Sequence, residues 1–118
     1  MRLTEIDFGA AQPVEGYGPG FFRIGGEAHD APLLVIPGQV REWGGYDDSG
    51  PLLDLAGQVD VLFIGTGSQI AHIPAALRST LEEAGLGVEI MDSPAACRTY
   101  NVLLSEQRRV ALAVLPVV

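Results

Sequence analysis

The sequence contains no lysine, and its only fully charged basic side chains are seven arginines. Fifteen acidic residues oppose them, so the formal net charge is −8. An acidic chain without a basic patch repels a phosphate backbone, and we therefore expect no nucleic-acid partner. A P-loop is excluded as well, because that motif uses a lysine to reach the nucleotide phosphates.

Cysteine and long apolar runs are also scarce. The single cysteine, Cys97, cannot form an internal disulfide, which fits a reducing compartment. No apolar run approaches the roughly 20 residues of a membrane-spanning helix. The opening residues, "MRLTEIDFGA", lack the apolar core of a signal peptide. These absences predict a cytoplasmic protein with no membrane insertion.

What the sequence does contain is enough for one core. The chain has 118 residues, of which 47% are hydrophobic. A chain of this length can bury a single core without disulfide or metal support. We therefore expect one α/β domain spanning residues 1–118.

The first half of the chain is rich in turn residues. Ten of the fifteen glycines lie between Gly16 and Gly57, a composition that favours short strands joined by turns. Strands are expected at 3–7, 21–28 and 32–38, loops at 15–20 and 40–51, and a helical turn within 51–57. We interpret Gly25-Gly26 as a β-bulge, although a hairpin turn is the alternative.

The second half alternates strands and helices. Apolar runs predict strands at 59–65, 87–91 and 110–117. Helical periodicity predicts helices near 74–84 and 93–106, with Ser93 as the N-cap of the second. Strand–helix–strand connections with short links favour right-handed crossovers and a largely parallel sheet with flanking helices.

The segment "FIGTGSQIAHIP" raises the question of a nucleotide site. Gly65 and Gly67 match the first two glycines of a dinucleotide fingerprint, but Ile70 occupies the third position. The helix also begins only near Pro74, too late to meet a pyrophosphate. We therefore expect neither NAD nor ATP to bind, and the sequence predicts no cofactor.

A weaker anion site remains open at the carboxyl ends of two predicted strands, where ligands of open α/β sheets bind. If those strands are neighbours, free N–H groups of the glycine turn lie beside the start of the Ser93 helix, and both features attract anions. The alternative is that the glycines only permit a tight turn and that Ser93 only caps. The candidate ligand-binding residues are Gly65, Thr66, Gly67, Asp92, Ser93, Arg98, Thr99 and Asn101.

Other candidate residues concern a partner-binding patch, a metal site or a reactive thiol. Trp43 and Tyr46, flanked by glycines, form either an exposed partner-binding patch or a lid over the sheet. His29, His72 and Cys97 share no metal-like spacing, so no metal site is expected. Cys97 lies near a helix start, where the dipole can lower a thiol pKa. No Cys-His pairing is readable, however, and a small buried apolar residue is the alternative.

Three segments, "GFFRIGGEAHDAPLLVIP", "DVLFIGTGSQ" and "GVEIMDSPAACRTYNVLLSEQRRVALAVL", resemble the small Mth-type domain family. That family includes a mitochondrial respiratory complex I assembly factor and an adipogenesis-associated protein. The resemblance implies a central mixed sheet with an added N-terminal β-hairpin layer, and it carries no agreed catalytic activity. It favours a non-enzymatic binding or assembly module with a protein partner, such as a respiratory complex. The alternative is a small-molecule or anion-binding enzyme that uses a pocket beyond Gly65-Thr66-Gly67 and Asp92-Ser93.

Overall fold

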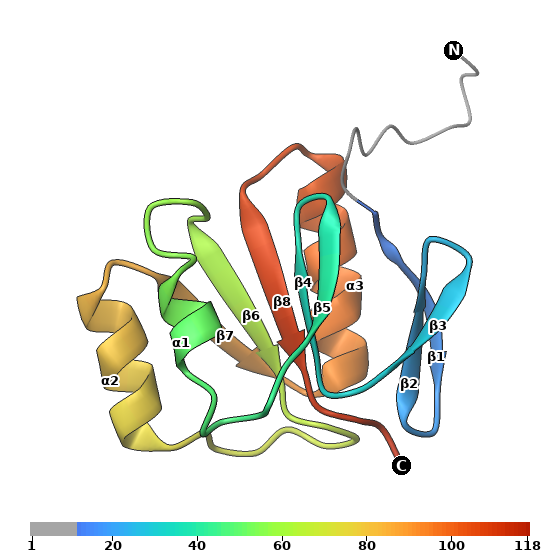
Figure 1. Cartoon of the computed structure of the whole chain (residues 1–118), viewed down its shortest axis with the longest axis horizontal. Helices are drawn as coiled ribbons and strands as arrows, with labels where there is room; N and C mark the ends of the chain where they lie inside the picture. The colour runs from blue at the N-terminus through green and yellow to red at the C-terminus, as the bar shows by residue number, and fades with distance from the viewer. Residues whose placement is uncertain (1–11) are drawn as a thin grey trace.

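The computed structural model describes residues 12–118, which form two sheets and three helices. The expected strand at 3–7 lies outside the described residues. The smaller sheet is an antiparallel meander of β1 (Val14–Gly18), β2 (Phe21–Ile24) and β3 (Glu27–Asp30). Figure 1 shows it at the end of the molecule opposite α2 (Ala75–Glu83).

The larger sheet has the strand order β5-β4-β8-β6-β7. Its parallel part, as predicted, consists of β6 (Val61–Gly65), β7 (Gly87–Met91) and β8 (Val110–Val114). The hairpin of β4 (Leu33–Ile36) and β5 (Gln39–Glu42) adds antiparallel to β8. The prediction of an α/β fold with a mixed central sheet and an added β layer is confirmed.

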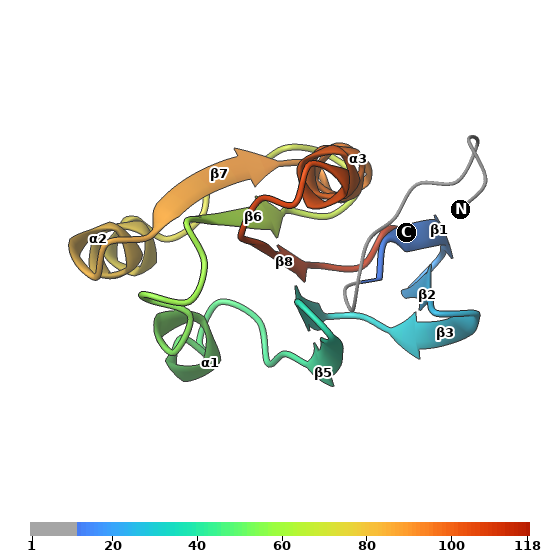
Figure 2. The same cartoon turned by 90° about the horizontal axis from the view of Figure 1, so that it is seen from above.

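Helices cover both faces of the larger sheet. Figure 2 shows α3 (Ser93–Ser105) on one face and the short α1 (Gly50–Leu53) on the other, with α2 beyond β7. Both long helices therefore lie where their periodicity predicts them, within one residue at each end. No helix within residues 12–118 is long and apolar enough to cross a membrane.

Two apolar clusters fill the core, one on each face of the larger sheet. Side chains alternate along a strand, so Phe63 packs toward α3 while Leu62 and Ile64 pack on the opposite face. The fully buried Tyr100 and Leu112 lie in the α3 cluster. Every residue of β8 is buried, as expected for a strand with neighbours on both edges and cover on both faces.

Three expectations about the first half are wrong. Gly25 and Gly26 have φ values of +62° and +81° and form the turn of the β2–β3 hairpin, not a bulge. Two consecutive positive φ angles suit a tight hairpin, and glycine adopts them without steric cost. The predicted loop at 15–20 contains most of β1, and the predicted loop at 40–51 begins within β5.

A contact from a distant helix accounts for β1. The Asn101 side chain on α3 accepts a hydrogen bond from the Val14 N–H at 2.9 Å and donates one to the Val14 carbonyl at 2.8 Å. This pairing holds the start of a glycine-rich strand against α3. Because its partner lies 87 residues away, no local pattern in the sequence predicts it.

Candidate functional site

The Gly-Thr-Gly turn and the start of α3 lie side by side, as the sequence predicts. Strands β6 and β7 are parallel neighbours, and Gly65 aligns with Met91 at their carboxyl ends. The glycine turn follows the end of β6, and α3 follows the end of β7. The candidate residues Gly65, Thr66, Gly67, Asp92 and Ser93 are therefore brought to one edge of the sheet.

The N–H groups of the turn are not free, however. The Ser93 hydroxyl accepts a hydrogen bond from the Gly67 N–H at 2.9 Å and donates one to the Leu115 carbonyl at 2.8 Å. In return, the Ser93 N–H donates to the Gly67 carbonyl at 2.7 Å. The Thr66 N–H donates to the Met91 carbonyl at 2.8 Å. The expectation of free donors at Thr66 and Gly67 is wrong, because the protein itself occupies them.

Gly65 permits this close contact between the turn and the helix. A Cβ at Gly65 would lie 2.7 Å from the Ser93 Oγ, 2.8 Å from the Ser93 Cα and 2.8 Å from the Val114 Cγ1. Only a residue without a side chain fits there. The glycine at this position thus has a packing role, whereas the alternative expected from the sequence was only a tight turn.

Asp92, and not Ser93, caps α3. Asp92 has an extended backbone, with φ −61° and ψ 158°, and its Oδ1 accepts a hydrogen bond from the Ala95 N–H at 2.8 Å. Ser93 is the first helical residue and is fully buried. Two adjacent residues of good capping type are indistinguishable by sequence, and the backbone conformation decides between them.

The cap leads to a prediction for Asp92. Replacing Asp92 by Ala is expected to lower the free energy of unfolding by about 1 kcal/mol, because the Ala95 N–H loses its partner. Asp92→Asn keeps an oxygen acceptor and is expected to lose much less. Urea unfolding followed by circular dichroism measures both. Equal losses in the two variants would contradict a capping role.

The remaining candidate polar residues do not face the turn. The Thr99 hydroxyl lies 3.4 Å from the Met91 sulfur, and Asn101 is bound to β1. Arg98 is exposed, and within residues 12–118 it makes no recorded contact with the turn. The Thr66 hydroxyl donates to the Gln69 carbonyl at 2.7 Å and so shapes the loop that follows the turn.

Trp43 is buried, which rules out the exposed patch and favours the lid. Its side chain is 3% exposed and packs in the apolar cluster opposite α3. The indole N–H donates to the Asp48 carbonyl at 3.0 Å. Tyr46 is half-buried, its ring meets the indole edge-on at 6.1 Å, and burial raises the pKa of its phenol. The loop from Trp43 to Asp48 therefore folds over the sheet.

Cys97 behaves as the small buried apolar residue that was the alternative to a nucleophile. Burial raises the pKa of its thiol to about 12, and this effect is larger than the opposing one of the nearby Arg98 charge. We expect iodoacetamide to alkylate the native protein at least about 100-fold more slowly than the protein in guanidinium, because the thiolate is the reactive form. Mass spectrometry follows the alkylation, and equal rates for the native and the unfolded protein would contradict this burial. Within residues 12–118 no group of three metal-ligating side chains occurs.

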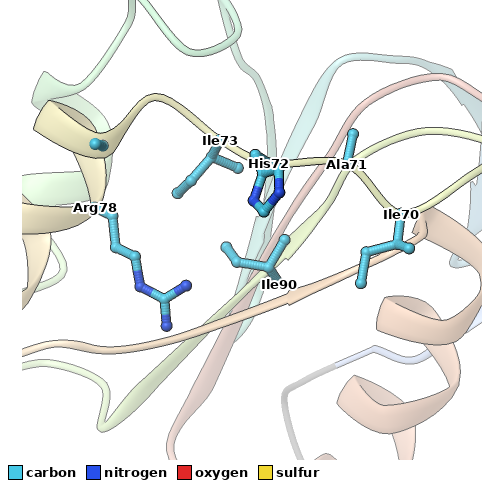
Figure 3. A pocket seen from close by; sticks show the side chains of 7 residues that line it. Ile70, Ala71, His72, Ile73, Arg78 and Ile90 are labelled. Atoms are coloured by element: carbon cyan, nitrogen blue, oxygen red, sulfur yellow. The ribbon is translucent and has the colours of Figure 1, made fainter.

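The structure contains a hollow that the sequence did not reveal. It has a volume of about 440 Å³ and lies between β7, the start of α2 and the chain that precedes α2 (Figure 3). We call it the Ile70 hollow; its lining residues are Ile70, Ala71, His72, Ile73, Ala75, Arg78 and Ile90. Two isoleucines within an otherwise loop-like segment, "QIAHIP", are the only sequence signal for it.

The arrangement defines a class of small α/β domains with a mixed five-stranded sheet beside a three-stranded meander. The same fold occurs in the crystal structure of an outer membrane protein from Bartonella henselae, with a TM-score of 0.83 and 33% identity. That match covers 92% of this chain and 97% of the other. A Mth938-like domain from Bordetella pertussis has a TM-score of 0.78 and 28% identity, over 98% and 92% of the two chains.

The chain belongs to the family described as protein of unknown function (DUF498/DUF598), whose model matches residues 14–115. An uncharacterized protein of Rhodobacter capsulatus is 50% identical over 116 residues, covering 98% of this chain and 94% of that protein. The zebrafish NADH dehydrogenase [ubiquinone] 1 alpha subcomplex assembly factor 3 is 34% identical over 123 residues, covering 98% and 71%. These matches confirm the resemblance to the assembly-factor family.

The relatives differ in what their names say about location. A protein of Francisella tularensis that is 30% identical, over 98% of this chain and 99% of its own length, is named a 13 kDa major membrane protein. The Bartonella structure is also of an outer membrane protein. The cytoplasmic location expected from the sequence therefore stays a prediction.

Proposed function

We propose that this chain is a non-enzymatic protein-binding module that assists the assembly of a multi-subunit complex. The observation that carries the proposal is the surface of residues 70–76, "IAHIPAA". These seven residues have no formal charge, and all except Ile73 are exposed, in a chain of net charge −8. Apolar surface beside a concave hollow is typical of a site that a protein partner covers.

The names of relatives also support an assembly role. Assembly factors for NADH dehydrogenase occur among them, and such proteins act on other subunits. By comparison, an anion-binding enzyme at Gly65-Thr66-Gly67 has weaker support, because the Thr66 and Gly67 N–H groups are already bound within the protein. A respiratory complex is the partner that the relatives suggest.

Affinity capture with matched surface variants tests the proposal. Ile70→Asp places a charge on a side chain that is 66% exposed, whereas the control Val102→Asp changes a side chain on α3 that is 56% exposed. The tagged chain is used to capture proteins from native lysate of the source organism, followed by quantitative mass spectrometry. We expect subunits of one complex to be enriched by the wild type and by Val102→Asp but not by Ile70→Asp. A subunit set that both variants retain, or no enriched set, would contradict the proposal.

A further inference from the structure

Strand β7 is an edge strand, and its outward backbone groups can be assigned. The Gly87 N–H donates to the Asp60 carbonyl, and the Met91 carbonyl accepts from the Thr66 N–H, so Gly87 and Met91 face β6. Backbone groups alternate in direction along a strand, and hence those of Val88 and Ile90 face outward. Within residues 12–118, their one recorded outward contact is the Arg78 Nη2 at 3.5 Å from the Val88 carbonyl.

The open part of this edge forms a wall of the Ile70 hollow. Ile90 lines the hollow, and in Figure 3 its side chain points toward His72 on the opposite wall. Ile70 and Ile73 lie on that opposite wall as well, and Arg78 closes one end beside β7. The site therefore combines an apolar cavity with an outward N–H and C=O pair at Ile90. Unpaired edge groups of this kind accept an additional strand.

Arg78 supplies the only formal charge among the residues that line the hollow. Its Nε lies 3.4 Å from the Glu82 carboxylate, but both side chains are exposed, and exposed pairs of this type are weak. A guanidinium has five N–H donors, so this pair and the Val88 carbonyl leave donors over for a second carboxylate. No carboxylate lines the hollow, so the Arg78 charge is not neutralised there. The hollow therefore suits a ligand that carries an anionic group next to an apolar group.

We infer that the Ile70 hollow binds the free C-terminus of a partner chain that ends in an apolar residue. The terminal carboxylate meets Arg78, and the last side chain lies among Ile70, Ile73 and Ile90. The backbone of the partner pairs with Ile90. Arg78 contacts Val88, two residues before Ile90, so the carboxylate lies toward the start of β7 and the added strand runs antiparallel to it. This inference rests on the proposed protein-binding function and names the partner's chemistry.

Two features favour a chain terminus over other occupants. The Arg78 guanidinium lies 3.5 Å from the Val88 carbonyl, so an added strand that keeps this contact ends there instead of continuing along β7. A second copy of this chain that docks through its own β7 fits poorly, because antiparallel self-pairing of β7 about Glu89 places two exposed glutamates opposite each other. The net charge of −8 on each copy adds to that repulsion.

Fluorescence polarisation with short peptides tests the inference. The probes are hexapeptides labelled at the N-terminus that end in Ile, Leu, Val, Phe, Gly or Asp, each with a free carboxylate and as the C-terminal amide. We expect a peptide with an apolar last residue and a free carboxylate to bind at least about 10-fold more tightly than its amide, because Arg78 pairs with the carboxylate. We expect the same margin over the Gly and Asp peptides, because the isoleucines contact the last side chain. No binding by any peptide, or equal binding of acid and amide, would overturn the inference.

Matched variants locate the peptide. Arg78→Gln and Ile70→Ser are expected to weaken binding about 10-fold and several-fold, whereas Arg98→Gln and Val102→Ser, which change exposed residues of α3, are expected to leave it unchanged. Binding should also shift the Ile90 amide in ¹⁵N spectra of the wild type. Equal losses in the α3 variants would place the peptide elsewhere and overturn the inference.

A third arm separates a chain terminus from a free small carboxylate. 4-Methylpentanoate carries the same apolar tail and charge but has no backbone to pair with Ile90. If it displaces the peptide with equal affinity, the hollow is a small-molecule site and the inference is wrong. If lysate capture depends on Ile70 but not on Arg78, and no peptide shows a carboxylate preference, the assembly function stands without this binding mode.

Discussion

Ser93→Ala is expected to lower the free energy of unfolding by about 2–4 kcal/mol, far more than loss of a helix cap. The Ser93 hydroxyl is buried and bonds both the Gly67 N–H and the Leu115 carbonyl. Truncation leaves the buried Gly67 N–H and the half-buried Leu115 carbonyl without the Ser93 hydroxyl, and a buried unsatisfied group costs about 1–3 kcal/mol. Urea unfolding, with midpoint and slope fitted together, measures the loss.

Ser105→Ala is the matched control for this experiment. The Ser105 hydroxyl also bonds a backbone carbonyl, that of Val102, but it does so at the exposed end of α3. Water replaces that bond, so we expect a change below about 1 kcal/mol. A loss at Ser93 no larger than at Ser105 would show that the turn and the helix can separate without cost.

Gly65→Ala is expected to destabilise the protein by about 1–3 kcal/mol for a steric reason. One added methyl group would lie 2.7–2.8 Å from two atoms of Ser93 and from Val114. One of these atoms is the backbone Cα of Ser93, which cannot rotate away, so β6 and α3 have to move apart. The same unfolding experiment measures the effect.

Gly16→Ala provides the comparison, because it adds the same methyl group to a strand glycine with no atom within 4 Å of the new position. We expect a change within about 1 kcal/mol there, since alanine restricts the unfolded chain without meeting an obstacle. In the double variant Gly65→Ala/Ser93→Ala, removal of the hydroxyl relieves one of the three close contacts. The stability loss of the double variant should therefore be smaller than the sum of the losses of the two single variants.

The sequence predicted the parts of the fold whose signal is local. Strand β6 is a nearly uninterrupted apolar run, and α2 repeats its apolar residues on one face, so the bounds of β6 were predicted within two residues and those of α2 within one. Strand β1 was missed because its glycines resemble a loop and its anchor, Asn101, is distant. Trp43 was ambiguous because a glycine-flanked tryptophan looks the same in sequence whether it is covered or exposed.

The sequence indicated where the candidate site lies but not whether its N–H donors are free. Parallel neighbours place their carboxyl ends together, so Gly65 and Ser93 were expected to be near each other if β6 and β7 pair, which they do. Whether the Gly67 N–H is free depends on where the Ser93 hydroxyl lies in the folded protein, which the sequence does not show. The Ile70 hollow was missed for a related reason. Ile70, Arg78 and Ile90 come from three separate segments and meet only in the folded chain.

The central place of β8 has a consequence for how the chain folds as it leaves the ribosome. Chain synthesis exposes residues in order, and β8 is the last strand of the larger sheet to emerge. Until residues 110–114 appear, the β4–β5 hairpin and the β6–β7 pair share no hydrogen bonds, because β8 lies between them. A nascent chain that stops at Arg109 thus displays two additional open strand edges, those of β4 and β6, and such edges favour aggregation and capture by chaperones. Completion of this sheet therefore waits for its central strand, which is the last of the five strands to be synthesised.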